Sequence, residues 1–553
     1  MKPHSLKIAF CYLFIIFAKE SKSDICQTCL CFSTDDSTMT MNCHRAGFST
    51  INTLRFELMS KKYSGSLTTL DLSNNDITSL PLDIFGSTNF LKIVNLSNNL
   101  LTILDSTIFQ NLKHLETLDL SNNHIEKVNL ITFPNLKVLD MSHNSIGNLD
   151  VEFHKAFPLL TDLNLSHNNL DDSMNGTLTL LSNMQNLDLA SNKFCSFDSE
   201  DFGLLRMLKR LNLNHNKVKS LSKHDFSNNL SHLDASFNSL ATFSANFVKV
   251  KNLDIAFNVI REINPQQSSN QSSELVFLNI SGNQLKTLSN FSFHKLKTLD
   301  LSYNDFTNIP STLSEDNYPA LKKLVFSGNK MTEIKFLSGL KIEYLIMQDM
   351  SLLGSIHADS FQKLRINEGD CINLTVTNNP NLSAINETAF DNLNICFLDL
   401  RHNNLSQLQP NILSSGFKAK LGVDLAGNPF HCNCSLQWML DDLIPWLYSV
   451  NRSLLNDLRC ATPGIHQGVR MVQWYGWKTK ALCHSGSPMY YSQLMSIERF
   501  QNLKTVRYIT LRASNSMLLI LIITGTVLLV LLVLGLILKR KLSNKRKRLN
   551  RRF

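Results

Sequence analysis

The sequence predicts an α/β solenoid, a fold in which short strands stack into one long sheet, and three observations predict it. The motif Leu-x-x-Leu-x-Leu-x-x-Asn begins at Leu67, Leu70, Leu72 and Asn75 and recurs along most of the chain. Its copies are mostly about 20 to 25 residues apart. A phenylalanine follows many of them. The anchoring asparagines are Asn75, Asn99, Asn123, Asn144, Asn168, Asn192, Asn216, Asn238, Asn258, Asn283, Asn304, Asn329, Asn379, Asn403 and Asn428.

Each repeat is expected to form one coil. The leucines of Leu-x-Leu point inward and the residue between them points outward. The asparagine turns the chain, and its amide bonds the backbone of neighbouring coils. One coil cannot bury its apolar face alone, so coils must stack. The sequence predicts a leucine-rich-repeat horseshoe of about 16 repeats, counting a degenerate copy at Leu345 and Met347. The return-side phenylalanines are Phe85, Phe109, Phe133, Phe202, Phe226, Phe293, Phe361 and Phe390.

Repeats of about 24 residues with a return-side phenylalanine resemble one subclass of animal extracellular proteins. That subclass includes Toll-like receptor ectodomains and neuronal or insect adhesion receptors. The resemblance covers residues 26–483 and implies recognition of another macromolecule. The chain departs from Toll-like receptors at its end, because residues 539–553 cannot hold their cytoplasmic signalling domain. We therefore expect any signal to pass through a partner.

Both ends of the chain carry signals of secretion and membrane attachment. Lys2 and Lys7 precede an apolar run, which indicates a secretory signal, with an uncleaved anchor as the alternative. Residues 517–538 lack charge over a length that crosses a bilayer. The basic run from Lys539 marks the cytoplasmic side. These features predict a single-pass type I protein of the plasma membrane, N-terminus outside. The expected parts are a signal peptide (1–23), an N-terminal cysteine-rich cap (24–66), the repeats (67–430), a C-terminal cap (431–483), a stalk (484–516), a transmembrane helix (517–538) and a basic tail (539–553).

The cysteines indicate an oxidising compartment, because clusters of them flank the repeats at both ends. By resemblance to the caps of extracellular leucine-rich repeats, the expected pairs are Cys26–Cys31, Cys29–Cys43, Cys432–Cys460 and Cys434–Cys483. Cys371 and Cys396 lie near the strand starts of adjacent coils and are expected to pair. Cys195 remains over, either as a buried thiol, which we expect, or as an intermolecular link. A zinc site is the competing interpretation of the first cluster.

Charge and missing motifs limit the chemistry. The chain has 54 Lys and Arg against 45 Asp and Glu. Nine of the basic residues lie in 539–553, so the basic excess gives no indication of nucleic acid. No phosphate loop, zinc-protease motif, nucleophile elbow or calcium loop is present. We expect no enzyme, no cofactor and no metal. Thirteen glycosylation sequons lie in the expected exterior: Asn95, Asn164, Asn175, Asn229, Asn270, Asn279, Asn290, Asn373, Asn381, Asn386, Asn404, Asn433 and Asn451.

Two repeated positions invite more than one interpretation. Histidines such as His143, His167, His215 and His402 stand just before an anchoring asparagine. We interpret that position as a surface turn, with a pH-sensing row as the alternative. The outward residue of Leu-x-Leu is often acidic. We interpret these acids as framework, with a stripe that attracts a basic ligand as the alternative. They are Asp71, Asp119, Asp140, Asp188, Asp234, Asp254, Asp300, Asp399 and Asp424.

Departures from the repeat predict the ligand-binding site. The outward acidic position becomes apolar at Val325 and Ile346, and Tyr344 is outward on the second of those strands. Tyr303 precedes an anchoring asparagine, and Phe277 is outward one coil earlier. We call these five residues the predicted stripe. Exposed apolar and aromatic residues of this kind often mark interfaces.

These observations favour two functions. The first is a cell-surface recognition or adhesion receptor that binds a protein ligand through the concave surface of the solenoid. The second is an innate-immune co-receptor or decoy related to Toll-like receptors. The expected partners are an extracellular protein ligand or co-receptor and, through a single pass, the membrane. No nucleic acid is expected, and homo- or heterodimers remain open.

Overall fold

The computed structural model describes residues 25–483, except 36–37, 50–64, 83, 87, 130–131, 151, 197–203, 222–228, 244–248, 264–272, 290–291, 367–368, 414–420 and 478–479. The chain divides into two units, residues 1–476 and 477–553. The predicted signal peptide, stalk, membrane span and tail lie outside the described residues. Within the described part, no helix is long and apolar enough to span a membrane.

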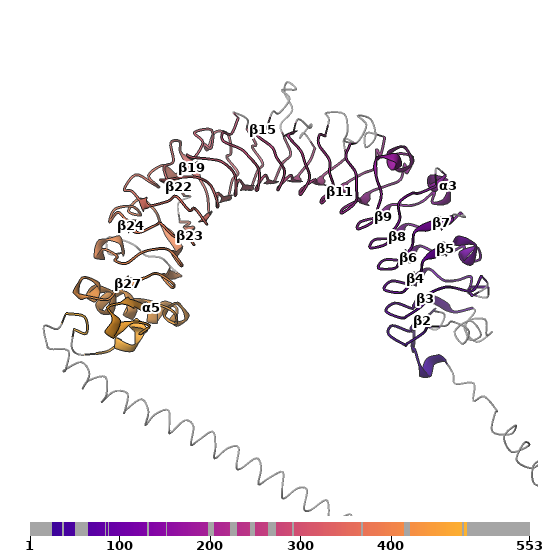
Figure 1. Cartoon of the computed structure of the whole chain (residues 1–553), viewed down its shortest axis with the longest axis horizontal. Coiled ribbons are helices and arrows are strands. Elements are labelled where there is room, and N and C mark those ends of the chain that lie inside the picture. The colour runs from indigo at the N-terminus through magenta and orange to yellow at the C-terminus, as the bar shows by residue number, and fades with distance from the viewer. Residues whose placement is uncertain are drawn as a thin grey trace, which may run out of the picture. The chain divides into compact units, whose positions relative to one another are not determined.

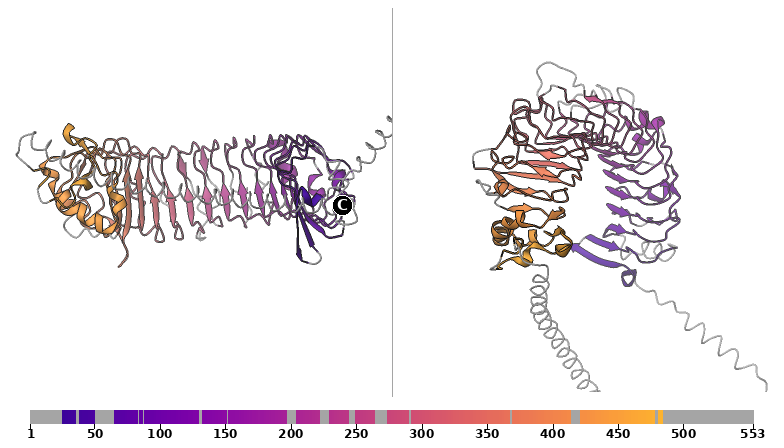
Figure 2. Two further views of the ribbon diagram at one scale, coloured as in Figure 1. Left: turned by 90° about the horizontal axis from the view of Figure 1, so that it is seen from below. Right: turned by 60° about the vertical axis from the view of Figure 1, so that its left-hand side comes forward.

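The main sheet runs through the first unit, and its 18 strands are counted over the described residues. Figure 1 and Figure 2 show its strands side by side along the row of coils. Each repeat strand pairs in parallel with the strands of the coils before and after it. The repeat strands are β3 (Leu67–Asp71), β4 (Ile93–Asn95), β6 (Thr117–Asp119), β8 (Val138–Asp140), β9 (Asp162–Asn164), β10 (Asn186–Asp188), β11 (Arg210–Asn212), β12 (His232–Asp234), β14 (Asn252–Asp254), β16 (Phe277–Asn279), β17 (Thr298–Asp300), β18 (Lys323–Val325), β20 (Tyr344–Gln348), β23 (Ile372–Thr377), β25 (Ile395–Asp399) and β26 (Gly422–Asp424).

The repeat motif explains why these strands form. In β6, Leu118 is buried, and Leu120 after it is fully buried. The anchoring asparagine then satisfies backbone groups that stacking takes away from water. Asn99 donates its amide hydrogens to the carbonyls of Leu72 at 3.0 Å and Leu96 at 3.0 Å, and accepts the N–H of Ile77 at 3.1 Å. The expected role of these asparagines is confirmed.

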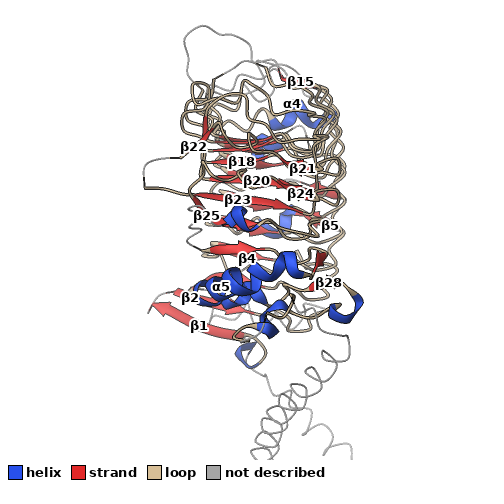
Figure 3. Ribbon diagram, turned by 90° about the vertical axis from the view of Figure 1, so that its left-hand side faces the viewer, coloured by secondary structure: helices blue, strands red, loops and turns tan. Residues whose placement is uncertain are grey.

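The return side consists mostly of turns, so the described coils form a β-solenoid and the α/β prediction is wrong. The two α-helices among the described repeats, α3 (Phe153–Ala156) and α4 (Asn175–Leu178), have four residues each. The return segments are short, and much of their length goes to placing Leu and Phe side chains in the core. Figure 3 shows loops dominating that side. Short parallel pairs also occur there: β5 (Ile103–Asp105) with β7 (Lys127–Asn129), β13 (Thr242–Phe243) with β15 (Glu262–Ile263), β19 (Leu340–Lys341) with β22 (Leu364–Arg365), and β21 (Ser355–Ile356) with β24 (Ala384–Ile385).

Phenylalanines from successive coils stack inside the return side. The ring centroids of Phe85 and Phe109 are 5.5 Å apart, and those of Phe133 and Phe157 are 5.3 Å apart. These rings are buried, as a framework role requires. Phe202 and Phe226 lie outside the described residues.

Caps cover both ends of the repeats. At the start, β1 (Leu30–Asp35) and β2 (Thr38–Asn42) form an antiparallel hairpin, and β2 pairs in parallel with β3. At the other end lie α5 (Ile444–Val450) and the pair β27 (Phe430–His431) and β28 (Cys460–Thr462). The Trp438 indole N–H donates to the carbonyl of Leu408 at 3.0 Å, which ties this cap to the last repeats. These contacts shield core side chains that an uncapped end would expose.

Candidate functional site

The outward side chains of the repeat strands form one surface, which we call the strand face. Strand register arranges these side chains in rows that run from coil to coil. One row contains the residue directly before Leu-x-Leu, such as Phe277 beside Thr298. The next contains the outward position of Leu-x-Leu, such as Asp300 beside Val325. A ligand lying along this face therefore meets rows of chemically similar side chains.

A third row lies where each coil leaves its strand, at the residue before the anchoring asparagine. Its members adopt the left-handed conformation, with φ of 53° at Phe237, 52° at Phe257 and 52° at Tyr303. Asn, His and Gly tolerate this conformation well, whereas a bulky side chain adopts it at a cost of about 1 kcal/mol or more. The same row holds His143, His167, His215 and His402, which confirms their interpretation as surface turns.

Aromatic side chains stack along this row in the middle coils. The rings of His215 and Phe237 have centroids 4.3 Å apart, and those of Phe237 and Phe257 are 4.5 Å apart and nearly parallel. About half of each larger ring remains exposed, 43% for Phe237 and 45% for Phe257. We call His215, Phe237, Phe257 and Tyr303 the aromatic ladder.

Glycines in the next coil let two of these rings lie flat. A Cβ atom at Gly282 would come within 2.6 Å of the Phe257 ring, and one at Gly328 would overlap the Tyr303 ring. The Tyr303 hydroxyl then donates to Asp349 Oδ2 at 2.6 Å. That hydrogen bond to the carboxylate, together with burial, raises the pKa of Tyr303 to about 12. Tyr303 is thus fixed in place although it is 49% exposed.

The acidic row runs beside the ladder, and its side chains support their own turns. Asp254 Oδ1 accepts the N–H of Ala256 at 3.0 Å, and Asp300 Oδ1 accepts that of Ser302 at 2.9 Å. The same contact recurs at Asp188 and Asp234. A carboxylate has about four acceptor positions, so capacity remains toward solvent. The framework interpretation is therefore correct for these contacts, and the row still presents negative charge.

The middle of the acidic row carries charge without an internal counter-ion. Among the described residues, no lysine or arginine forms an ion pair with Asp188, Asp234, Asp254 or Asp300, which we call the central carboxylates. Burial, followed by the neighbouring carboxylates Asp234 and Asp300, raises the pKa of Asp254 above its usual range. Burial lowers the pKa of nearby His232, so its imidazole adds little positive charge at neutral pH.

A groove of about 500 Å³ follows the strand face from β8 to β16. Its apolar lining consists of Val138, Phe277 and leucines of the repeat strands. Its polar walls include Asp140, Asp162, Asp188, Asp234 and Asp254, with Arg210 as the one arginine or lysine among the lining residues that the structure describes. The groove therefore combines an apolar lining with a strongly acidic wall.

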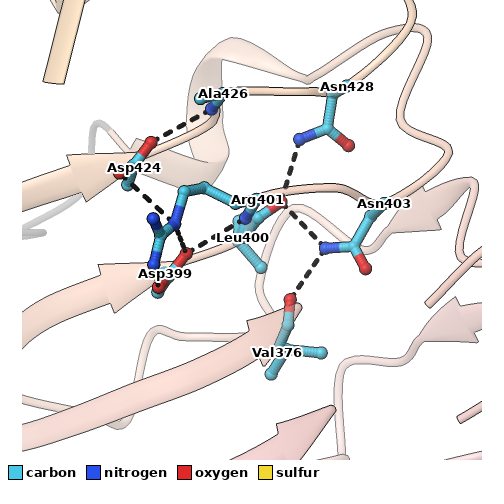
Figure 4. Close-up of polar contacts among 8 residues, drawn as sticks. All are labelled: Val376, Asp399, Leu400, Arg401, Asn403, Asp424, Ala426 and Asn428. Carbon is cyan, nitrogen blue, oxygen red and sulfur yellow. Dashed lines mark hydrogen bonds and ion pairs between the residues drawn. The ribbon is translucent and has the colours of Figure 1, made fainter. Parts of the chain in front are cut away.

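The C-terminal coils differ, because Arg401 occupies the position that Ser holds in most other coils. Its guanidinium lies 2.7 Å from Asp399 Oδ2 and 3.5 Å from Asp424 Oδ2. Figure 4 shows Arg401 between the two carboxylates, beside the asparagine contacts of Asn403 and Asn428. In these coils the chain's own Arg401 supplies a counter-charge to the acidic row.

The predicted stripe is dispersed over three rows. Val325 and Ile346 are register partners in the acidic row and are half-buried. Phe277 and Tyr344 share the first row, but Thr298 and Lys323 stand between them. Tyr303 belongs to the ladder. The register at Tyr344 is defined by the pairing of β20 with β18 and β23. Where Met350 replaces the asparagine, its N–H donates to Asn379 Oδ1 at 2.8 Å.

Sequence reasoning missed Phe237 and Phe257, which give the ladder its continuity. The signal was present, since both stand directly before an anchoring asparagine, as Tyr303 does. A second signal is the glycine at the same position of a following coil, Gly282 after Phe257 and Gly328 after Tyr303. An aromatic ring in a left-handed turn needs such a glycine if it is to lie flat on the next coil.

The imidazoles of His143 and His167 also stack, with centroids 4.0 Å apart. Burial, followed by the positive charge that His143 can carry, lowers the pKa of His167. These rings lie toward the N-terminal side of the ladder, in the coils of β8 and β9. A pH-sensing role for them stays a prediction.

The structure pairs Cys26 with Cys31, Cys29 with Cys43, Cys371 with Cys396 and Cys432 with Cys460, as expected. Cys434 and Cys483 are both disulfide-bonded. A zinc site is therefore not the arrangement of the first cluster. Cys195 is free and half-buried, so the expectation of a buried thiol is wrong. It lies on the return side, where its N–H donates to Asp172 Oδ1 at 2.6 Å and holds the residue near the surface.

Several predicted glycosylation sites lie on the strand face. Asn164 and Asn279 belong to the acidic row and donate to Asp140 at 3.0 Å and Asp254 at 2.9 Å. A glycan on Asn279 would project beside the ladder. Asn175 is buried in the return side, which argues against a glycan there. Asn270 and Asn290 lie outside the described residues, and occupancy of the remaining sequons stays a prediction.

The fold and its site define a leucine-rich-repeat protein, and comparison with known families agrees. Models described as leucine-rich repeats match residues 65–125, 113–155, 158–173 and 295–315. These segments contain β3 to β9 and β17. Solenoids of this kind typically serve as scaffolds for protein interaction. No curated protein sequence matches the chain.

Solved structures resemble the chain at low sequence identity. The glycosylated Toll–Spatzle complex of Drosophila is 20% identical, covers 74% of this chain and 64% of its own, and gives a TM-score of 0.53. A leucine-rich-repeat protein of Leptospira interrogans is 24% identical, covers 65% of this chain and 89% of its own, and has a TM-score of 0.48. The LRIM1/APL1C complex is 17% identical, covers 82% and 71%, and has a TM-score of 0.43. At these identities the likeness concerns the fold alone.

Proposed function

We propose that the protein is a cell-surface recognition or adhesion receptor that binds a protein ligand through its strand face. The observation that carries the proposal is the aromatic ladder. Its bulky rings are exposed, and three of them occupy strained left-handed positions that asparagine or glycine would fill at lower cost. Exposed aromatic anchors are the usual hot spots of protein interfaces.

The proposed ligand contact includes the predicted stripe, namely Phe277, Tyr303, Val325, Tyr344 and Ile346. Tyr303 and Tyr344 are exposed, whereas Phe277, Val325 and Ile346 are half-buried and can form a floor beneath a ligand. This mixture of anchor and floor is typical of interface cores. The glycosylated Toll–Spatzle structure is a complex by name, which supports a binding role for this fold class.

The proposed location is the plasma membrane, with a single pass at residues 517–538 and the repeats outside. The uncharged stretch and the basic run that follows it support this topology. Surface biotinylation and external protease on intact cells test it. Labelled, protease-accessible repeats are expected, and repeats that resist protease on cells carrying the labelled protein would contradict the topology.

Cross-linking on cells that express the full chain tests the binding function. The captured protein partner is identified by mass spectrometry, and its affinity is compared among variants. Tyr344→Ala combined with Ile346→Asp is expected to weaken binding about thirtyfold, because loss of an anchor costs about 2 kcal/mol. The matched control is Tyr475→Ala with Ile465→Asp, which removes an exposed Tyr and Ile from the C-terminal cap. Equal binding by both double variants would remove the strand face from the proposal.

A second candidate role is an innate-immune co-receptor or decoy. The fold likeness to the Toll–Spatzle complex favours it, at the level of fold alone. Homophilic clustering of expressing cells supports adhesion, whereas binding of microbial products to the same cells supports the immune role.

A further inference from the structure

We infer that the strand face between β10 and β18 binds an extended, cationic segment of a partner protein. In this arrangement apolar side chains of the segment cover the aromatic ladder, and lysine or arginine side chains reach the central carboxylates. The inference rests on the proposed function and names the chemistry of its ligand.

The ladder supplies the apolar half of the surface. Phe237 and Phe257 stack on one another, and Gly282 supports the far side of the Phe257 ring. Because these contacts fix the rings before any ligand arrives, a partner loses little free energy in ordering them. Tyr303 extends the same edge and is fixed by Asp349. The ladder is thus a preformed apolar strip with exposed rings.

The acidic row determines which partner fits. Asp234 and Asp254 are register partners on adjacent strands, and Asp300 follows one coil beyond Asn279. Neighbouring strands lie only about 4.8 Å apart, so the carboxylates of Asp234 and Asp254 repel each other unless a cation lies between them. The side chains of the described residues supply no such cation here, whereas Arg401 supplies one to Asp399 and Asp424. A lysine or arginine of the partner would supply the missing counter-charge to these carboxylates.

The two rows run side by side from coil to coil, which favours an extended segment. Successive side chains of an extended chain point to opposite sides. A segment lying along the rows can therefore direct apolar side chains to the ladder and cationic ones to the carboxylates in alternation. Arg210 and Lys323 stand in the first row, and among the described residues neither forms an ion pair with a central carboxylate. Lys209 and Lys251 lie one position earlier, at the other edge of the face. They do not neutralise the row that the segment contacts.

The same charges oppose a nucleic acid. The bases of a nucleic acid would have to stack on the aromatic ladder. Their phosphate groups would then lie close to the central carboxylates. Repulsion between like charges across an interface opposes binding. We therefore take a cationic polypeptide as the occupant, and a single-stranded oligonucleotide serves as a negative probe.

The probe for this inference is a fluorescent ten-residue peptide that alternates Lys and Tyr. Its charge-inverted counterpart alternates Glu and Tyr. Fluorescence anisotropy measures the binding of both to the full chain in detergent micelles. The Lys/Tyr peptide is expected to bind at least tenfold more tightly than the Glu/Tyr peptide or an oligothymidine, and to weaken as salt rises. Absence of binding by the Lys/Tyr peptide, or equal binding of the three probes, overturns the inference.

Tyr303→Asn tests the ladder with little risk to folding. It makes residues 298–304 identical in sequence to residues 117–123, which already form a coil of this chain. Phe257→Asn places a residue that tolerates the left-handed conformation at the centre of the ladder. Each variant is expected to weaken binding of the Lys/Tyr peptide about tenfold. The control is Phe90→Asn, which removes an equally exposed ring, stacked on His114, from outside the strand face. Equal loss in the control, or no loss in both ladder variants, contradicts the inference.

Asp300→Ser tests the charge. A serine hydroxyl can still accept the N–H of Ser302, so the turn survives without the carboxylate. Asp119→Ser is the matched control, because Asp119 ends an identical Thr-Leu-Asp strand and accepts the N–H of Ser121 at 2.9 Å, as Asp300 does with Ser302. Asp300→Ser is expected to weaken binding of the Lys/Tyr peptide about fivefold. It is not expected to weaken binding of the Glu/Tyr peptide. Equal effects of the two variants would reject the cationic half of the proposal.

These results separate the inference from the proposed function. If cells capture a protein partner whose binding depends on Tyr344 and Ile346 while the Lys/Tyr peptide does not bind, only the inference of a cationic segment is wrong. If the peptide binds as expected and no partner is captured, the receptor proposal is the part that fails.

Discussion

The middle and C-terminal coils share one framework and differ in how they treat charge and strain. In the C-terminal coils, Arg401 lies between Asp399 and Asp424, and Asp399 is buried. In the middle coils, Asp234, Asp254 and Asp300 have no such partner among the described residues, and strained aromatic rings stand beside them. The first region satisfies its charges internally. The second leaves charge and apolar surface to the solvent, as expected of a surface that awaits a ligand.

The largest expected effect concerns the framework that both regions share. Asn258→Ala in the middle and Asn403→Ala near the end each remove buried hydrogen bonds. Asn258 donates to Ala235 and Ile255 and accepts from Leu240, and Asn403 donates to Val376 and Leu400 and accepts from Asn379. Unpaired buried groups cost about 1 to 3 kcal/mol each, so each variant should lose roughly 3 kcal/mol of unfolding free energy. Urea denaturation measures it.

Unequal losses of unfolding free energy in the two variants would show that the two regions do not share one framework. If Asn403→Ala destabilised the protein strongly while Asn258→Ala had little effect, the middle coils would be loosely packed. The exposure of the ladder would then reflect weak packing, with no need for a ligand.

An intermediate effect is expected at the internal ion pair. Arg401→Gln leaves the buried Asp399 without its guanidinium, and the penalty is reduced because water reaches the half-exposed Arg401 site. We expect a loss of about 2 kcal/mol in urea denaturation at neutral pH. The control is Arg210→Gln in the central groove, which should change stability by less than about 0.5 kcal/mol. A loss as large at Arg210 would mean that the middle coils are neutralised from within as well.

The smallest expected effect is a pH dependence at Asp254. Its pKa is raised in the folded protein, so the folded state holds this proton to higher pH than the unfolded state. Wild-type stability therefore falls as pH rises through the window above about 4. Asp254→Asn lacks this loss, so the melting temperature of the variant relative to wild type should be higher at pH 7 than at pH 4. Calorimetry at both values checks it, and a constant difference would show that burial and like charge do not penalise this carboxylate.

The framework was predictable because its signal is periodic. Leu118, Leu120 and Asn123 occupy the positions that the motif assigns to them, since each repeat solves the same packing problem. The helical content was not predictable in this way. Leu and Phe on the return side indicate burial, but they do not say whether the chain reaches the core through a helix or through turns.

The site was predictable only in part. Tyr303, Tyr344 and Ile346 were predicted because they depart from the repeat, and the structure places them in different rows. Ligand contact at these residues stays a prediction. The row to which a residue belongs is set by its position within the repeat. The predicted stripe instead combined residues because their repeats are neighbours in the sequence. Phe237 and Phe257 were missed because their motif positions are otherwise regular. Their importance comes from stacking across coils, which a single repeat does not reveal.

Hydroxyl-radical footprinting of the full chain, alone and with its captured protein partner, tests the central claim most directly. Phe257 and Phe90 are almost equally exposed, 45% and 48%, so their oxidation rates compare one side of the molecule with the other. We predict that the partner slows oxidation of Phe237, Phe257 and Tyr303 several-fold and leaves Phe90 unchanged. Protection of Phe90 with an unchanged ladder would contradict the claim that the middle of the strand face is the binding surface.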